Sequence, residues 1–194
     1  MHRISSDKEY YENGKVAIDA DGVPVDLGYR GTGSPESKVS APVGSIYTDS
    51  SATNGAIRWI KASGAGNTGW RVEYGDTGWR NLSRSSVAPG WSGGFYVRRI
   101  GNTVHIRTHQ LAADETATVA LVDMPTGFKA DNIGSAVGRY LMHEANQEST
   151  VWRIYFAGSL LSLSKVPPST ARLYGDVSWN TSEVWPTTLP GTPA

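Results

Sequence analysis

The stretch GFYVRRIGNTVHIRTHQL, residues 94–111, contains two runs of alternating apolar and polar side chains separated by Gly101 and Asn102. Alternation with a period of two places successive side chains on opposite faces of an extended strand. A glycine followed by an asparagine suits the two-residue turn of a β-hairpin. The stretch therefore predicts an antiparallel hairpin that turns at residues 101–102.

The rest of the chain has the composition of an all-β protein. It contains 22 glycines, 10 prolines, 7 tryptophans and 9 tyrosines, which favour turns and short strands over helices. Further strands are predicted in TATVALVDM, TVWRIYFAG, SLLSLSKV and ARLYGDVSW. Residues 137–149 could form a helix, with a strand and a loop as the alternative. Strands at this spacing predict a β-sandwich or jelly-roll.

Charge and cysteine content exclude several classes of function. Eighteen basic and eighteen acidic residues cancel without a run of either sign, so we expect neither a nucleic-acid partner nor a membrane partner. The absence of cysteine excludes disulfides, thiolate metal sites and cysteine nucleophiles. The first residues lack the apolar core of a signal peptide, so we expect a soluble protein without a Sec signal.

Turn signals divide the chain into three parts. Residues 1–32 are polar and broken, with brief extended candidates in KVAID and VPVDL. Residues 33–78 contain three short antiparallel strands, GSIYTD, GAIRWIKAS and GWRVEY, and we name this part the shoulder. Residues 79–194 are the largest part and form the predicted sandwich, which we name the head.

The shoulder carries the motifs that resemble a known family. GSPESKVSAPVGSIYTDSSATNGAIRWIKASGAGNTGWR, residues 33–71, resembles a module of tail fibres and of receptor-binding or minor tail proteins of tailed bacteriophages. The end of the chain, GDVSWNTSEVWPTTLPGTPA, is similar to the closing segment of such tail-tip heads. Residues 83–173 resemble these heads only in the rhythm of their strands.

The resemblance implies a protein of the phage virion, made in the host cytoplasm and placed at the tail tip. It implies attachment to the host surface through a cell-wall saccharide, and an N-terminal segment that contacts other tail or baseplate proteins. Three shoulder strands have too small a core to be stable alone, so we expect a homotrimer. The expected interface residues are Ile57, Trp59, Trp70 and Val72.

Candidate saccharide-binding residues gather in GRYLMHEANQESTVWRIY, because sugars bind to aromatic platforms surrounded by hydrogen-bonding side chains. The candidates are Arg139, Tyr140, His143, Glu144, Asn146, Trp152 and Arg153. The alternative is that Trp152, Ile154 and Phe156 fill the core while the polar residues face water. A structural role is expected for Trp79, Trp91, Trp179 and Trp185.

No catalytic or metal-binding motif is present, so we expect neither enzymatic activity nor a cofactor. His105 and His109 lie about 13 Å apart along a strand, too far to hold one ion within a chain. In a trimer each histidine could meet its own copies on the three-fold axis and hold a metal ion, or the two could have a plain polar or stacking role.

Glycan hydrolysis by carboxylates from different strands would also fit the sequence. The scattered acids are Asp114, Glu115, Glu144, Glu148, Asp176 and Glu183. The same composition and strand pattern would suit an architectural tail protein or a stand-alone carbohydrate-binding module.

Overall fold

The computed structural model describes residues 2–3, 10–12, 16–18, 24–26, 28–83, 87–131, 140–144 and 147–194, with side chains in 28–83, 87–131 and 151–194. Every regular element in these ranges is a β-strand, so the all-β prediction is confirmed. The described part of residues 137–149 is also strand, as the alternative to a helix proposed. Within the described ranges no helix is long and apolar enough to cross a membrane.

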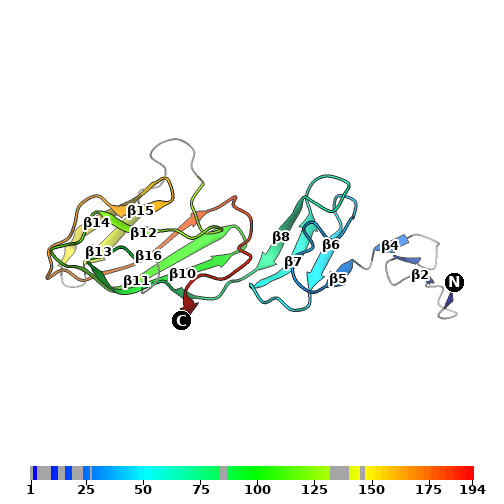
Figure 1. Ribbon diagram of the computed structural model, residues 1–194, viewed down its shortest axis with the longest axis horizontal. Helices are drawn as coiled ribbons and strands as arrows, with labels where there is room; N and C mark the ends of the chain where they lie inside the picture. The colour runs from blue at the N-terminus through cyan, green and yellow to red at the C-terminus, as the bar shows by residue number, and fades with distance from the viewer. Residues whose placement is uncertain are drawn as a thin grey trace. The chain divides into compact units, whose positions relative to one another are not determined.

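The chain divides into two compact units, Met1–Tyr74 and Gly75–Ala194. The head thus begins a few residues before the boundary predicted at residue 79. Figure 1 shows that three separate sheets follow one another along the chain.

The first unit contains two small sheets. The N-terminal sheet has the order β1-β2-β3-β4 and consists of β1 (His2–Arg3), β2 (Tyr10–Glu12), β3 (Val16–Ile18) and β4 (Pro24–Asp26). The shoulder sheet has the order β5-β6-β7-β8 and consists of β5 (Tyr29–Gly31), β6 (Ile46–Asp49), β7 (Ala56–Lys61) and β8 (Trp70–Gly75). The three predicted shoulder strands are present, and β5 adds a parallel pair with β6 that lies outside the predicted limits.

The Gly-Ser-Pro-Glu opening of the shoulder is fastened to the start of β8. The carboxylate of Glu36 accepts hydrogen bonds from the backbone N–H of Gly69 at 3.2 Å and of Trp70 at 2.9 Å. The indole N–H of Trp70 donates to the carbonyl of Val39 at 2.9 Å. One carboxylate thus accepts hydrogen bonds from two neighbouring backbone N–H groups. This links the glutamate of the motif to the Gly-Trp pair that lies more than thirty residues later.

Polar side chains are buried within the shoulder. Oδ1 of Asp49, which is 3% exposed, accepts hydrogen bonds from the N–H of Gly33 at 2.8 Å and from the N–H and hydroxyl of Ser51 at 2.9 and 2.7 Å. Burial raises the pKa of Asp49, but these hydrogen bonds outweigh it and hold the pKa below its usual value. Lys61 is fully buried, and its ammonium donates to the carbonyl of Thr68.

The head is built on one nine-stranded sheet of order β12-β15-β14-β13-β16-β11-β10-β9-β17. Its strands are β9 (Arg80–Asn81), β10 (Trp91–Ile100), β11 (Thr103–Ala113), β12 (Ala120–Asp123), β13 (Tyr140–Glu144), β14 (Gln147–Ala157), β15 (Leu160–Leu163), β16 (Leu173–Asn180) and β17 (Thr192–Pro193). β10 and β11 pair antiparallel up to Ile100 and Thr103, so the predicted hairpin and its two-residue turn are confirmed.

This sheet folds over on itself to enclose the core. β10 and β12 lie far apart in the strand order, yet the indole N–H of Trp91 on β10 donates to the carbonyl of Ala120 on β12 at 3.0 Å. Val87 and Val122 form a further bridge across the fold. The enclosed side chains are apolar and include the fully buried Phe95. A sandwich results because the sheet's apolar face has no other partner to cover it.

The C-terminal segment is tied to the head by a buried arginine. Arg99 is 3% exposed and donates to the backbone carbonyls of Gly127 at 2.7 Å, Glu183 at 2.9 Å and Val184 at 3.1 Å. Its guanidinium lies 5.0 Å from the ring centroid of Trp185. Burial lowers the pKa of Arg99 to about 10, so the group remains charged at neutral pH. The predicted structural role of Trp185 is confirmed by this contact.

Candidate functional site

The hairpin of β10 and β11 has one face in the core and one face exposed. Phe95, Val97, Val104 and Ile106 point inward and are at most 1% exposed. The alternate residues of β10, β11 and β16 form the opposite face, which we name the outer face of the head. It combines aromatic, basic, acidic and hydroxyl side chains: Tyr96, Arg98, His105, Arg107, His109, Tyr174, Asp176 and Ser178.

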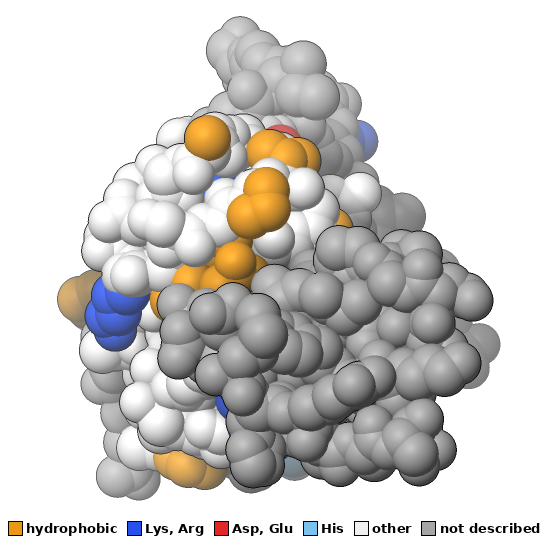
Figure 2. All heavy atoms as spheres, turned by 90° about the vertical axis from the view of Figure 1, so that its right-hand side faces the viewer, with side chains coloured by type: hydrophobic (Ala, Val, Ile, Leu, Met, Phe, Trp, Pro, Cys, Tyr) orange, Lys and Arg blue, Asp and Glu red, His pale blue; other side chains and the backbone are white. Residues whose placement is uncertain are grey.

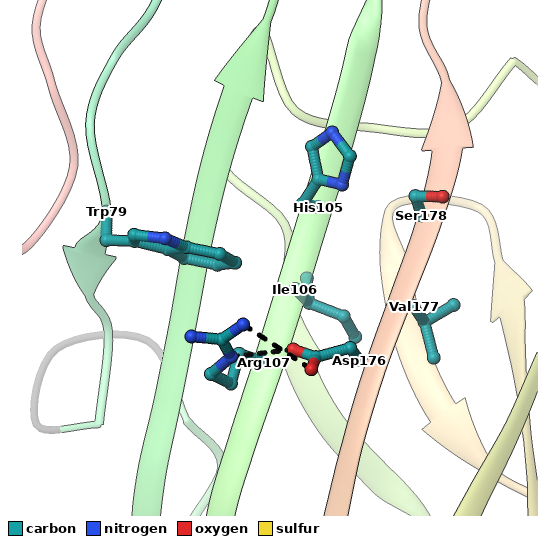
Figure 3. A pocket seen from close by; sticks show the side chains of 7 residues that line it. All are labelled: Trp79, His105, Ile106, Arg107, Asp176, Val177 and Ser178. Carbon is teal, nitrogen blue, oxygen red and sulfur yellow. Dashed lines mark hydrogen bonds and ion pairs between the residues drawn. The ribbon is translucent and has the colours of Figure 1, made fainter.

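A recess of about 240 Å³ opens on this outer face. It is lined by Trp79, His105, Ile106, Arg107, Asp176, Val177 and Ser178. Figure 3 shows the indole of Trp79 extending across β10 toward β11, with Arg107 and Asp176 pointing toward one another beside it. Three segments far apart in the sequence therefore meet in the recess: the residue before β9, the middle of β11 and the middle of β16.

Two exposed side chains of opposite charge line the recess and form an ion pair. Nε of Arg107 donates to Oδ1 of Asp176 at 2.7 Å, and the two residues are direct partners in the antiparallel ladder. The guanidinium carbon lies 4.9 Å from the ring centroid of Trp79, within range of a cation–π contact. The hydrogen bond to Asp176 raises the pKa of Arg107, so this side chain stays charged at any physiological pH.

A second ion pair lies next to the recess. Nε of Arg98 donates to Oδ1 of Asp76 at 2.9 Å, and its Nη2 donates to Oδ2. The hydrogen bond from Arg98 lowers the pKa of Asp76 against the opposite effect of burial, and the nearby His105 lowers it further. The outer face thus carries two ion pairs, and in each of them one arginine is matched by one aspartate.

Such an arrangement suits an uncharged polyhydroxyl ligand. Guanidinium N–H groups donate to hydroxyl oxygens, while carboxylate and imidazole groups accept from hydroxyl protons. An indole covers the apolar C–H face of a sugar ring. Because both charges are already paired, a neutral ligand replaces water at the recess without leaving a charge unpaired.

The sequence-predicted saccharide residues fall in three groups. Arg139 and Asn146 lie outside the described residues, and the side chains of Tyr140, His143 and Glu144 do too, although their backbones form β13. Trp152 is 3% exposed within the head core, and Arg153 is exposed on β14. The role expected for Trp152 as an exposed platform is therefore corrected, because a buried indole offers no face to a sugar.

The predicted interface residues of the shoulder divide in a similar way. Trp59 and Trp70 are each 6% exposed, and the Trp70 ring makes edge contacts with Tyr29 and Tyr47. Ile57 is 41% exposed, and Val72 is half-buried. Trp59 and Trp70 therefore serve the core of their own unit, which leaves Ile57 and Val72 as the accessible part of that surface. Figure 2 shows one face of the molecule, on which hydrophobic side chains of described residues (orange) form small patches between backbone and other side chains (white).

Three of the six acids considered for glycan hydrolysis, Asp114, Asp176 and Glu183, have structural partners. Glu183 accepts from the N–H of Gly127 at 2.6 Å and of Lys129 at 3.1 Å, and Asp114 accepts from the N–H of Thr116 at 2.7 Å. The side chains of Glu144 and Glu148 lie outside the described residues. In the described part of the chain, no group of three or more His, Cys, Asp or Glu side chains is placed to hold a metal ion.

Sequence reasoning missed the recess because its residues are ordinary when taken separately. A structural role is expected for Trp79, yet its half-buried ring lines the recess; Trp91 and Trp179 are buried as predicted. Asp176 counts only as one scattered acid until β11 and β16 are paired. The alternation in the hairpin was the one signal in the sequence that could have indicated the recess, because it places Arg107 on the face away from the core.

Comparison with protein-family models, with curated proteins and with solved structures finds no match to this chain.

Proposed function

We propose that this chain is a structural and adhesive protein of a bacteriophage tail tip that attaches the particle to a bacterial cell-wall saccharide. The observation that carries the saccharide part is the recess in which Trp79, Arg107 and Asp176 meet on the outer face of the head. The placement in a phage tail rests on the resemblance of residues 33–71. In this motif a turn at residues 35–39 is hydrogen-bonded through Glu36 to the start of β8, which is compatible with a role in joining parts of a fibre.

The proposed mechanism is multivalent. A shallow recess of this kind binds one sugar weakly, with a dissociation constant of about a millimolar. Several heads on one particle then engage the same wall, and each later contact is effectively intramolecular. In this proposal the head supplies the contacts, the shoulder joins copies of the chain, and the N-terminal segment contacts other tail or baseplate proteins.

Binding to bacterial walls tests the saccharide role. The full chain is labelled with a fluorophore and mixed with protein-stripped walls from a panel of bacteria, with and without soluble wall polysaccharide as competitor. We expect saturable binding to at least one wall, competed by its polysaccharide and lost in Trp79→Ala. The backbone carbonyl of Trp79 is bonded to the N–H of Ala194, so removing the indole leaves this attachment in place.

A matched control is Asp123→Asn, an exposed substitution on β12 at the far end of the strand order. Wall binding that survives in Trp79→Ala to the same extent as in Asp123→Asn contradicts the recess as the site. Absence of binding to every wall contradicts the adhesive role and favours a purely architectural tail protein.

We also propose that the protein is a homotrimer joined through the shoulder. Ile57 keeps 41% of its surface exposed on β7, and a second copy would cover it. Light scattering should then return a mass three times the 20.9 kDa of one chain. A folded monomer that persists across the accessible concentration range would contradict the trimer, while leaving the recess unaffected.

A further inference from the structure

Three aromatic rings lie on the outer face of the head beside the recess. His109 of β11 and Tyr174 of β16 make an edge-to-face contact with ring centroids 5.3 Å apart and planes at 85°. Tyr96 of β10 lies on the same face; its ladder partner is Arg107, but its ring leans over Gly94, which is the partner of His109. We name these three residues the aromatic row. It crosses three neighbouring strands, whereas the recess lies further along β11.

The backbone around the aromatic row departs from regular strand geometry. The ladders of β11 with β10 and with β16 both shift register beside this row, and Gln110 takes a positive φ of 51°. An inserted residue of this kind re-aims the side chains next to it, and such bulges are frequent beside binding sites. Here the irregularity presents both His109 and Gln110 to solvent instead of burying one of them.

Gly94 makes room for one of the three rings. It faces His109 across the ladder, and a Cβ placed on it would lie 2.6 Å from Cε2 of Tyr96. The Tyr96 ring therefore lies over the bare backbone of Gly94, next to His109. A larger residue at position 94 would push this ring away from the sheet.

The aromatic row and the recess are in line along the strands. The Arg107–Asp176 pair of the recess is followed along β11 and β16 by the His109–Tyr174 pair, about 7 Å further on. A single pyranose ring stacked on the indole of Trp79 would not also lie over the His109–Tyr174 pair. A chain of linked sugars lying along the two strands can place one ring at Trp79 and another over the aromatic row.

We propose that the aromatic row is a second sugar subsite and that the ligand of the head is therefore an oligosaccharide of at least two linked units. This inference rests on the proposed function of the recess and extends it. Ring faces in the row cover the C–H faces of a sugar, and the hydroxyl groups of Tyr96 and Tyr174 meet its polar edge. The recess gives polar recognition, and the row adds apolar contact.

The test measures how affinity depends on the length of the ligand. The wall polysaccharide bound by the full chain is partly hydrolysed and separated into mono-, di-, tri- and tetrasaccharide fractions, and each is titrated calorimetrically. We expect an increase in affinity of about tenfold or more between the monosaccharide and the longer fractions. Tyr174→Ala should abolish this increase and leave monosaccharide affinity unchanged, whereas Trp79→Ala should weaken binding of every fraction.

Two further variants keep the test independent of folding. Tyr174→Phe retains the ring and should retain the dependence on length. Gly94→Ala displaces the Tyr96 ring without removing it and should reduce the affinity for longer fractions only. Near-ultraviolet circular dichroism and thermal melting confirm that each variant is folded.

The outcomes separate the two proposals. Equal affinity for all fractions, or an unchanged length dependence in Tyr174→Ala, overturns the second subsite while the recess stands. Loss of monosaccharide affinity in Tyr174→Ala assigns this residue to the recess and also overturns the second subsite. Absence of binding by any fraction, with no wall bound by the intact protein, overturns the proposed function and this inference with it.

Discussion

The shoulder and the head are both β-structures, but different interactions hold them. The head encloses an apolar core in which Phe95 and Leu111 are fully buried. The shoulder has few strands and instead buries the carboxylate of Asp49 and the ammonium of Lys61, each with hydrogen-bond partners. Small domains bury too little apolar surface to be stable through it alone. This explains why the shoulder also relies on hydrogen bonds of buried polar side chains.

This difference teaches how to interpret the motif-rich part of the sequence. The Gly-Ser-Pro-Glu stretch of the shoulder contains a polar group, Glu36, that is hydrogen-bonded within the fold of its own unit. The head carries the candidate binding face, and most of its sequence lacks such a motif, because an apolar core accepts many combinations of residues. The shoulder motif thus marks how that unit is built, while the candidate site lies in the head.

The largest expected effect is on the head core. Phe95→Ala should destabilise the head by about 3–5 kcal/mol, because it leaves a cavity beneath the hairpin. Hydrogen exchange of the full chain in increasing urea should show earlier opening in the head and unchanged opening in the shoulder. The matched control is Val184→Ala, whose side chain is 76% exposed and whose effect should stay within about 0.5 kcal/mol. Equal loss of protection in both units would show that they unfold together and remove the contrast.

The buried arginine of the head tests whether polar groups matter there too. Arg99→Lys keeps the charge but lacks the planar fork that reaches the carbonyls of Gly127, Glu183 and Val184. We expect a loss of about 2–3 kcal/mol, because buried carbonyl groups lose their partners. Thermal melting measures the loss, and hydrogen exchange should locate it in residues 181–190. Arg98→Lys, at a partly exposed ion pair, should cost less than about 1 kcal/mol; an equal cost for both variants would contradict the role of burial.

Removal of the glutamate in the shoulder motif should have a smaller effect confined to that unit. Glu36→Ala leaves the N–H groups of Gly69 and Trp70 without their acceptor and should cost about 2 kcal/mol. Glu73→Ala is the control, because its ion pair with Arg58 is solvent-exposed and should contribute less than about 1 kcal/mol. Tryptophan fluorescence during urea unfolding, with hydrogen exchange to assign the unit, measures both. A change in the head alone would contradict the fastening role of Glu36.

The smallest expected effect is the acid sensitivity of the shoulder. The pKa of Asp49 in the folded protein lies below its ordinary value of 3.8, so its stabilising contribution is fully present above that pH and is lost as pH falls through the folded pKa. In Asp49→Asn the melting temperature of the shoulder should therefore fall less steeply as the pH is lowered. Asp76→Asn should do the same for the head, because the pKa of Asp76 is also lowered. If Asp49→Asn leaves this pH dependence unchanged, the hydrogen bonds from Gly33 and Ser51 do not stabilise the ionised form.

Much of the secondary structure follows from local pattern. Alternation together with a Gly-Asn turn predicts the hairpin of β10 and β11, and the same pattern predicts β12, β14, β15 and β16. These predictions succeed because the two-residue period of a strand is set by the backbone. The parallel strand β5 is not predicted, since a parallel pair depends on a distant partner.

The sites were harder to predict than the strands. Trp59, Trp70 and Trp152 were expected at an interface or a binding face, and all three are buried within their own units. An aromatic residue on a strand has the same local pattern whether its face is covered or exposed. Only the packing of the rest of the chain distinguishes the two cases.

The sequence by itself determined that this protein is built of short strands, where its main hairpin turns and which hairpin residues face away from the core, because these properties depend on neighbouring residues alone. The tertiary structure decided that Trp79, Arg107 and Asp176 share one recess and that His109 and Tyr174 continue it. Those contacts join residues about 30 to 100 positions apart, and their geometry depends on strand order and register, which the local pattern leaves open.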